Sequence, residues 1–350
     1  MQMRSLSKSF AAAIAAILCA AMPAAAQWWN PQSPIAPGKW EAESRSFVYS
    51  RDVYNVAIQV MLEALQRGDI AKLERMHGDF LKMTIAGGNG SRMLNAFPQA
   101  FGAFFRKDRL EEGKSLLKAW QASAPASGLR TIAEAQMWLS AAWEERGGGY
   151  ASEVSPEAMR LFRQYLDRAS HALDEGGQAA KQTPLWYSTK LTIGGSRGDD
   201  ARALDAIFEE GVRRFPHFML QYHARLALLL PQWGGSYDRV DAFIRRAVMD
   251  TQAQDGTWMY AELYADVNAM FSGEDFFRET RASWPLMRHA FEDAPRGLAE
   301  DNAYATFACM ARDRETTGRL LDRLGSYANL GMGRDTFTTE ACRAMVEQAK

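Results

Sequence analysis

The sequence has little cysteine, no excess of charge of either sign and no hydrophobic run of membrane-spanning length. Its 350 residues include three cysteines, and 41 lysines and arginines stand against 42 aspartates and glutamates. A chain so near neutrality has no bulk electrostatic field for nucleic acid, so we do not expect a nucleic-acid partner. With 47% hydrophobic and 24% charged residues, the chain has enough apolar material for a folded core.

Motifs that would identify an enzyme or a cofactor site are also missing. Ser236 lies outside any nucleophile-elbow pattern, and the glycines beside it lack the lysine of a phosphate-binding loop. His217 and His223 fall on different faces of a helix, so they do not form a zinc-ligand pair. We therefore expect no metal, no cofactor and no catalytic residue.

The first 26 residues have the parts of a bacterial signal peptide. Arg4 and Lys8 give a positive start, residues 10–22 are almost wholly apolar, and Ala24–Ala26 fit the small-residue rule for cleavage. The apolar part has about 13 residues, whereas roughly 20 are needed to span a bilayer as a helix. We expect cleavage after residue 26, a periplasmic or secreted mature protein, and no stable membrane anchor after cleavage.

Two cysteines, Cys309 and Cys342, remain in the mature chain. An exported protein matures where disulfides persist, so these residues can form one bridge if their Cα atoms lie close together. Two buried free thiols are the other alternative. The sequence leaves both open.

The mature chain reads as a short lead-in followed by helices. Residues 27–40 contain several prolines and no hydrophobic period, which predicts an extended, proline-rich segment. Beyond them, apolar residues recur at spacings of three and four, and almost no segment alternates at period two. The predicted fold class is all-α.

Capping residues indicate where helices begin and end. A first apolar stripe ends at Gly68, and Asp69 then caps the next helix. Ser155-Pro156 and Thr183-Pro184 each place a capping hydroxyl before a proline at the first helical position. The first stripe consists of Val53, Val56, Ala57, Val60, Met61, Ala64 and Leu65.

The order of these helices predicts stacked antiparallel hairpins, a tetratricopeptide-like α-solenoid. Phe208, Gly211 and Pro216 have the spacing of the positions that end a tetratricopeptide repeat, although the similar stretch from Phe243 lacks the later proline. No linker interrupts residues 41–350, so we predict a single helical-repeat domain.

Three segments stand out by their local sequence: Gly68-Asp69 with Leu73-Glu74, the run Trp143–Ala151, and the run Leu229–Ser236. Together they resemble domain-of-unknown-function family 4034, a family of bacterial exported proteins, over roughly residues 55 to 250. That family usually has Arg before the Trp of the last motif, where this chain has Gln232. The resemblance implies a helical, tetratricopeptide-like protein and brings no assigned activity.

The two glycine-rich runs supply the candidate binding residues. A glycine-rich turn before a helix exposes backbone N–H groups to an anion or a peptide carboxylate, with Trp233 as a flat contact surface. The alternative is helix punctuation, in which Ser236 caps a helix and Arg146 lies near the carbonyls of a helix end. If a solenoid brings both loops to one edge, they form a shared groove. The candidates are Arg146, Gly148, Tyr150, Trp233, Gly234, Gly235 and Ser236.

These features predict an exported helical-repeat scaffold that binds a protein or peptide partner in the periplasm, without catalysis. One alternative is a glycan-processing enzyme of the envelope with a helical toroid fold and two facing carboxylates. Another is a structural or immunity-type partner with a flat apolar patch and no groove. Adjacent acids diverge on a helix and look solvated, which favours binding over glycan hydrolysis. The pairs are Glu144-Glu145, Asp199-Asp200 and Glu209-Glu210.

Overall fold

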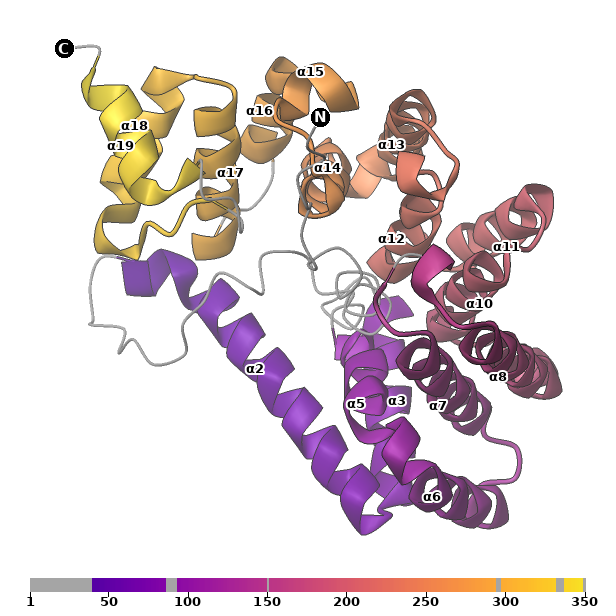
Figure 1. The fold of residues 1–350 in the computed structure, drawn as a ribbon. Helices are drawn as coiled ribbons and strands as arrows, with labels where there is room; N and C mark the ends of the chain where they lie inside the picture. The colour runs from indigo at the N-terminus through magenta and orange to yellow at the C-terminus, as the bar shows by residue number, and fades with distance from the viewer. Residues whose placement is uncertain (1–39, 86–92, 150, 294–296, 332–336, 349–350) are drawn as a thin grey trace. The chain divides into compact units, whose positions relative to one another are not determined.

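The computed structural model describes residues 40–85, 93–149, 151–293, 297–331 and 337–348, and in these ranges the chain forms helices and no strand (Figure 1). The predicted all-α class is therefore confirmed. The predicted signal peptide (1–26), the predicted lead-in up to residue 39, and Tyr150 lie outside the described residues. Each described helix is too short or too polar to cross a lipid bilayer.

Contacts group the chain into two compact units. The first contains residues 54–225, and the second contains residues 226–350 together with residues 40–53. Both divisions fall inside a helix, namely α2 (Trp40–Arg67) and α12 (Met219–Ala227). A division inside a helix carries no glycine- or proline-rich linker. The sequence therefore contains no linker at either division, and for this reason it predicts one domain over residues 41–350.

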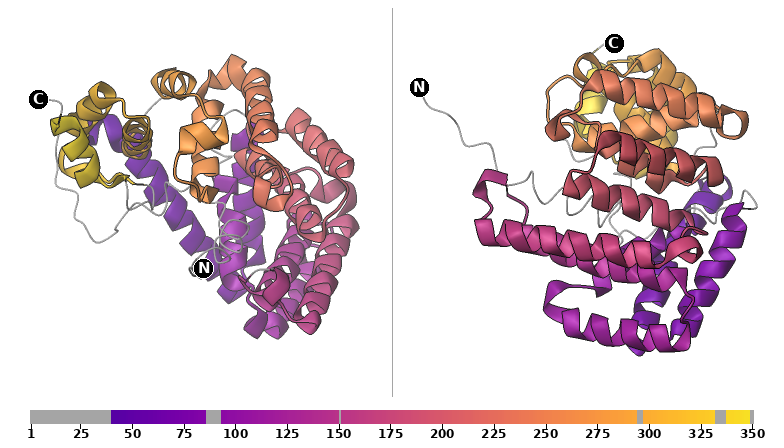
Figure 2. Two further views of the ribbon diagram at one scale, coloured as in Figure 1. Left: turned by 45° about the horizontal axis from the view of Figure 1, so that its top comes forward. Right: turned by 90° about the vertical axis from the view of Figure 1, so that its right-hand side faces the viewer.

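The first unit is a succession of helices joined by short connections. After α2 they are α3 (Ile70–Ile85), α5 (Ala96–Phe104), η2 (Lys107–Arg109), α6 (Leu110–Ser123), α7 (Gly128–Arg146), η3 (Ala151–Glu153), α8 (Pro156–Glu175), α9 (Gly177–Ala180), α10 (Pro184–Arg197), α11 (Ala201–Arg214) and α12. Helix α7 packs against α5, α6, α8, α9 and α10, while α10 also packs against α8 and α11. The helices α7, α8, α10 and α11 lie side by side in this order (Figures 1 and 2).

Helices α7 and α10 form the centre of the first unit because both are covered on most sides. Leu129, Ile132 and Leu139 of α7 are buried, and so is Leu191 of α10. One polar contact crosses between these two helices, since Gln136 Nε2 donates to Thr189 Oγ1 at 3.1 Å. A buried amide has to be hydrogen-bonded, so this pair fixes one register of α7 against α10.

Most predicted helix boundaries agree with the structure. Gly68 ends α2 at a φ of +66°, and Asp69 Oδ1 accepts from Lys72 N at 3.0 Å at the start of α3. Ser155 Oγ accepts from Ala158 N at 3.1 Å before α8. Helix α10 does begin at Pro184, but the Thr183 hydroxyl forms no capping bond, and its buried Oγ1 has no hydrogen-bond partner among the described residues.

One residue that the periodicity assigns to the first buried stripe is exposed in the structure. Val56 is 60% exposed, whereas Ala57, Met61 and Leu65 are buried. Spacing shows which residues share a face of a helix but leaves the width of the buried face open. The buried stripe of α2 is narrower than the apolar stripe of the sequence.

The second unit has a core rich in aromatic residues. Its elements are η4 (Pro231–Trp233), α13 (Tyr237–Asp255), α14 (Trp258–Met270), α15 (Phe276–Thr280), α16 (Trp284–Asp293), α17 (Leu298–Met310), α18 (Arg314–Leu324), η5 (Gly325–Tyr327) and α19 (Thr339–Glu347). Phe291 of α16 stacks on Tyr304 of α17 with ring centroids 4.8 Å apart. Phe276 and Phe307 meet at 5.5 Å, so side chains from α15, α16 and α17 share one core.

A disulfide closes the C-terminal part of the second unit. Cys309, near the end of α17, is bonded to Cys342 of α19, and their Cα atoms are 5.8 Å apart. Helix α19 also packs against α18 (Figure 1). The structure thus has the bridge, one of the two alternatives that the sequence left open.

Candidate functional site

The first glycine-rich loop follows α7, and Arg146 at the end of that helix is hydrogen-bonded to two carbonyl oxygens of the loop. Gly147 has a φ of +67°, and Arg146 Nη1 donates to the carbonyl oxygens of Gly147 and Gly149 at 3.2 Å each. The same guanidinium lies over the ring of Trp143, 5.3 Å from its centroid. Gly148 is half-buried within this loop. Arg146 therefore binds the end of its own helix, as the helix-punctuation alternative predicts.

The second loop lies between α12 and α13 and is held by backbone contacts. Gly234 has a φ of +82° and donates to Pro231 O at 3.0 Å, and Gly235 donates to Leu230 O at 3.1 Å. A Cβ placed on Gly235 would lie 1.8 Å from Leu229 O. Only glycine lets the chain pass this close to the preceding turn. The conformation of this loop is therefore fixed by its backbone.

This fixed turn presents Trp233 to solvent. The side chain is 42% exposed, which makes it one of the few large exposed hydrophobic side chains in the described part of the chain. Just after it, Ser236 Oγ accepts from Arg239 N at 3.3 Å and caps α13, as predicted. Asp238 in the first turn of α13 pairs with Arg281 at 2.8 Å. The structure thus places an exposed indole on a turn whose backbone is held by hydrogen bonds.

The predicted candidates thus fall into two groups with different surroundings. Arg146 and Gly148 belong to a closed loop of the first unit, and Trp233 to Ser236 form a rigid turn of the second unit. A groove shared by both loops stays a prediction.

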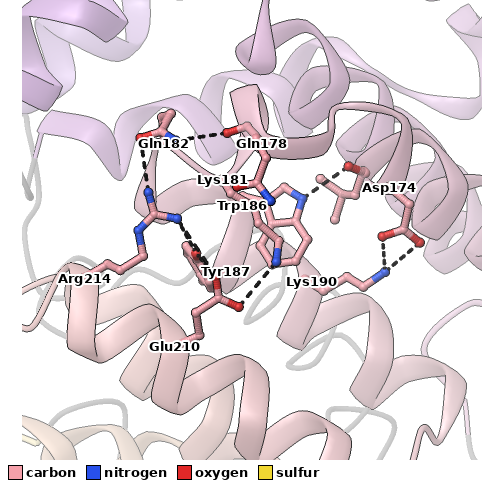
Figure 3. A network of polar contacts seen from close by, with 10 residues as sticks. Asp174, Gln178, Lys181, Gln182, Trp186, Tyr187, Lys190, Glu210 and Arg214 are labelled. Carbon is pink, nitrogen blue, oxygen red and sulfur yellow. Dashed lines mark hydrogen bonds and ion pairs between the residues drawn. The ribbon is translucent and has the colours of Figure 1, made fainter.

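The structure also contains a polar cluster that the sequence did not suggest. We call it the Tyr187 cluster; its members come from the residues around α9, from α10 and from α11 (Figure 3). Tyr187 Oη donates to Glu210 Oε1 at 2.8 Å and accepts from Arg214 Nη1 at 2.9 Å. Lys181 lies 3.3 Å from Glu210 and 4.8 Å from the ring centroid of Trp186. The members are Lys181, Gln182, Trp186, Tyr187, Glu210 and Arg214.

The Tyr187 cluster holds two cations, Lys181 and Arg214, around one carboxylate, Glu210. Burial and the hydrogen bond to Glu210 raise the pKa of Tyr187 to about 12, so the phenol stays protonated at neutral pH. The same hydrogen bond holds the pKa of Glu210 below its usual range. These contacts join α10 to α11. Contacts between separate helices leave no periodic signal, and only Glu210 belonged to a predicted pair.

The predicted pairs of adjacent acids take part in structural contacts. Glu144 accepts from Lys107 N at 3.1 Å, and Glu145 pairs with the Lys107 ammonium. Asp200 Oδ1 accepts from Arg202 N at 2.9 Å and caps α11. Glu210 belongs to the Tyr187 cluster. Glu144, Asp200 and Glu209 are exposed, as the sequence predicts, while half-buried Glu145 and Glu210 hold contacts between helices.

Two titratable groups, the half-buried His77 and the buried Asp266, have strongly shifted pKa values. In α3, burial lowers the pKa of His77 to about 4, and its ring meets Phe97 edge-on with centroids 5.7 Å apart. In α14, burial raises the pKa of Asp266 to about 8. Burial disfavours the charged form of each group, so at neutral pH both are mainly uncharged.

No metal centre is apparent in the described ranges, since no three His, Cys, Asp or Glu side chains gather there as a metal site requires. Comparisons with protein-family models, with curated proteins and with solved structures gave no match. The resemblance to domain-of-unknown-function family 4034 therefore stays a prediction.

Proposed function

We propose that this chain is an exported helical-repeat protein that binds a protein or peptide partner and does not catalyse a reaction. The observation that carries this proposal is Trp233, a 42% exposed indole on a turn with fixed backbone geometry. Tryptophan is enriched among the residues that dominate binding energy at protein interfaces. A rigid turn also lowers the entropy lost on association.

Helix contacts in the first unit support the repeat architecture. Helix α7 packs against α8, its neighbour in the chain, and also against α10, which packs in turn against α11. In a helical-repeat stack, the first helix of each pair contacts both its own partner and the first helix of the next pair. We take α7–α8 and α10–α11 as two successive pairs of a tetratricopeptide-like solenoid, in agreement with the predicted family resemblance.

The disulfide supports export. A bond between Cys309 and Cys342 persists in oxidising compartments such as the bacterial periplasm and is rare in the cytosol. The predicted signal peptide over residues 1–26 would deliver the chain there. The two observations are independent, because one comes from the N-terminal sequence and the other from the packing of α17 and α19.

The contacts of the acidic residues favour binding over the alternative of glycan hydrolysis. A glycosidase needs two carboxylates that face each other across the substrate, one of them with a raised pKa. The predicted adjacent acids instead cap helices or pair with cations, as Asp200 and Glu210 do. Asp266 has the raised pKa but lies in the core of the second unit, 8% exposed.

Site-specific photo-crosslinking tests the proposal. The mature chain, residues 27–350, carries a photoreactive phenylalanine in place of Trp233 and is irradiated with envelope extract. A control chain carries it in place of Met249, which is 61% exposed on α13 of the same unit. We expect one identified protein to be crosslinked from position 233 and not from position 249.

Binding of that protein is then measured for purified Trp233→Ala and Met249→Ala variants. We expect at least about a tenfold loss of affinity for Trp233→Ala, as for a dominant interface residue, and no loss for Met249→Ala. Equal crosslinking from both positions, or equal affinity of both variants, would overturn the assignment of binding to this turn. Thermal unfolding of both variants shows that each is folded.

A further inference from the structure

Helix α19 is attached to its unit mainly by a covalent bond. Of its nine residues, Cys342 is the one that the structure buries, at 0% exposure. Its sulfur is bonded to Cys309 of α17, which is 4% exposed. A helix normally docks through a stripe of buried apolar side chains, whereas in α19 the neighbours of Cys342 on the same face, Thr339, Met345 and Val346, are only half-buried.

The other contacts of α19 are few and lie close to its surface. Thr339 Oγ1 accepts from Leu330 N at 3.0 Å and donates to Ala328 O at 3.3 Å. Arg343 donates to Gly325 O at 3.3 Å. Val346 lies over Gly318 of α18, where a Cβ would come within 3.3 Å of Val346 Cγ1.

These contacts are weak compared with the cost of keeping a short helix ordered. An isolated helix of fewer than about 12 residues is marginal in water, so α19 depends on its attachment for its structure. The hydrogen bonds of Thr339 and Arg343 contribute about 1 kcal/mol each, and half-buried Met345 and Val346 supply only part of the apolar burial of a docked helix. The bond to Cys309 supplies the missing attachment.

We propose that the Cys309–Cys342 disulfide is a redox latch for α19. While the bond is intact, α19 is docked against α17 and α18 and covers both sulfur atoms. When a dithiol reductant cleaves the bond, α19 leaves these helices and both thiols become accessible. This latch is independent of the binding function proposed above.

The chemistry is thiol–disulfide exchange with a dithiol. A thiolate of the reductant attacks one sulfur of the bridge and forms a mixed disulfide, and the other sulfur leaves as a thiolate and takes up a proton. The second thiol of the reductant then attacks the mixed disulfide, releases the second cysteine and closes the disulfide of the reductant. Two electrons and two protons pass from the dithiol to Cys309 and Cys342. Because both sulfurs are buried, the attack takes place during a brief local opening of α19, and loss of the bond then makes this opening persistent.

Hydrogen exchange followed by mass spectrometry tests the latch on the full mature chain. Exchange is compared between the oxidised protein and the protein reduced with dithiothreitol. We expect amides of residues 339–347 to exchange at least about tenfold faster after reduction, with α13 and α14 unchanged. The Cys309→Ser, Cys342→Ser double variant should show the same exchange without reductant. Equal protection of α19 in oxidised and reduced protein would overturn the latch.

The rate at which dithiothreitol reduces the bridge provides a second test, with variants that keep both cysteines. Val346→Ala removes a contact that holds α19 against α18, so reduction by dithiothreitol should become several-fold faster. Val248→Ala is the matched control, because Val248 is half-buried on α13 of the same unit. Identical reduction rates for these two variants would contradict a bridge protected by docked α19.

Discussion

Both compact units contain a loop with paired or tripled glycines, and the two loops use glycine differently. In the first unit, glycines let the chain turn back so that Arg146 can bind the carbonyls of Gly147 and Gly149. In the second unit, Gly235 lets the chain pass beside Leu229, and the preceding Trp233 is left in solvent. The first loop satisfies its own polar groups, whereas the second presents a side chain. Glycine content alone therefore does not identify a binding loop.

The units also differ in the titratable group that each buries. The first unit holds His77 with a lowered pKa and the second holds Asp266 with a raised pKa. Burial is the cause in both, and the opposite directions follow because a histidine is charged when protonated and an aspartate when deprotonated. The two groups therefore give opposite dependences of stability on pH.

The strongest way to separate the two loops is to add one methyl group to each. Gly235→Ala places a Cβ against the Leu229 carbonyl, so we expect a loss of about 4 kcal/mol or more in the free energy of unfolding. Gly149→Ala meets only the flexible end of Glu153 and should cost about 1 kcal/mol or less. Urea unfolding of both variants measures the difference. Similar losses would show that the second loop is not held by this close approach.

Replacing the buried acid should stabilise the second unit at neutral and alkaline pH. The folded-state pKa of Asp266 is about 8 against an ordinary value of 3.8. Its contribution to stability is therefore present below pH 3.8 and is lost as the pH rises toward 8. We expect Asp266→Asn to raise the free energy of unfolding by about 2–4 kcal/mol at pH 8. Little change is expected at pH 4, and a variant less stable at pH 8 would contradict the assigned cause.

His77 gives the opposite test in the first unit. Its folded-state pKa is about 4 against 6.5, so its contribution is present above pH 6.5 and is lost as the pH falls toward 4. The variant His77→Phe keeps a ring against Phe97. Between pH 7 and pH 5, we expect its free energy of unfolding to fall by about 1–2 kcal/mol less than that of the parent. Urea unfolding at the two pH values measures this, and parallel losses would refute it.

The two loops should differ at the glycine that has a positive φ in each. Gly147 has a φ of +67° and a ψ of −175°, a region that is essentially closed to other residues, whereas Gly234 has a φ of +82° and a ψ of +11°, in the left-handed region. A Cβ at either glycine would meet no atom within 4 Å, so backbone strain alone decides the cost of a substitution. We expect alanine to cost about 1–2 kcal/mol at Gly234 and about 2–3 kcal/mol at Gly147. Thermal unfolding compares the two. An equal cost at both positions would mean that the loop after α7 changes its backbone to relieve the strain.

The smallest expected difference is between removing the side chain of Arg146 from the first loop and removing that of Trp233 from the second. Arg146→Ala removes two hydrogen bonds and a contact with Trp143, and should cost about 1 kcal/mol of stability. Trp233→Ala removes an exposed side chain and should change stability by less than about 0.5 kcal/mol. Calorimetry of both measures the contrast. A larger loss for Trp233→Ala would assign Trp233 to the fold instead of to a surface that binds.

Local features of the fold were predictable because they depend on neighbours in the chain. The cap at Ser155, the stop at Gly68 and the cap at Ser236 need only the residues within one helical turn. The exposure of Val56 was not predictable in this way, since it depends on which elements pack beside α2. The same limit applies to Thr183, whose hydroxyl lies buried instead of capping α10.

The sequence identified residues of the candidate site but did not predict the role of each one. Sequence reasoning selected Arg146 and Trp233 together, because both stand beside glycines. The structure gives the arginine a partner within its own loop and leaves the tryptophan exposed. The Tyr187 cluster was missed because its members, such as Lys181 and Arg214, meet only once α10 and α11 are packed.

The amino-acid sequence by itself determined the helical class and most of the helix ends, because apolar spacing and capping act over a few residues. Only the tertiary structure decided the bond between Cys309 and Cys342, the burial of His77 and Asp266, and the exposure of Trp233. Each of these depends on the distance between residues far apart in the chain. That distance is fixed by how the helices pack, which no local pattern encodes.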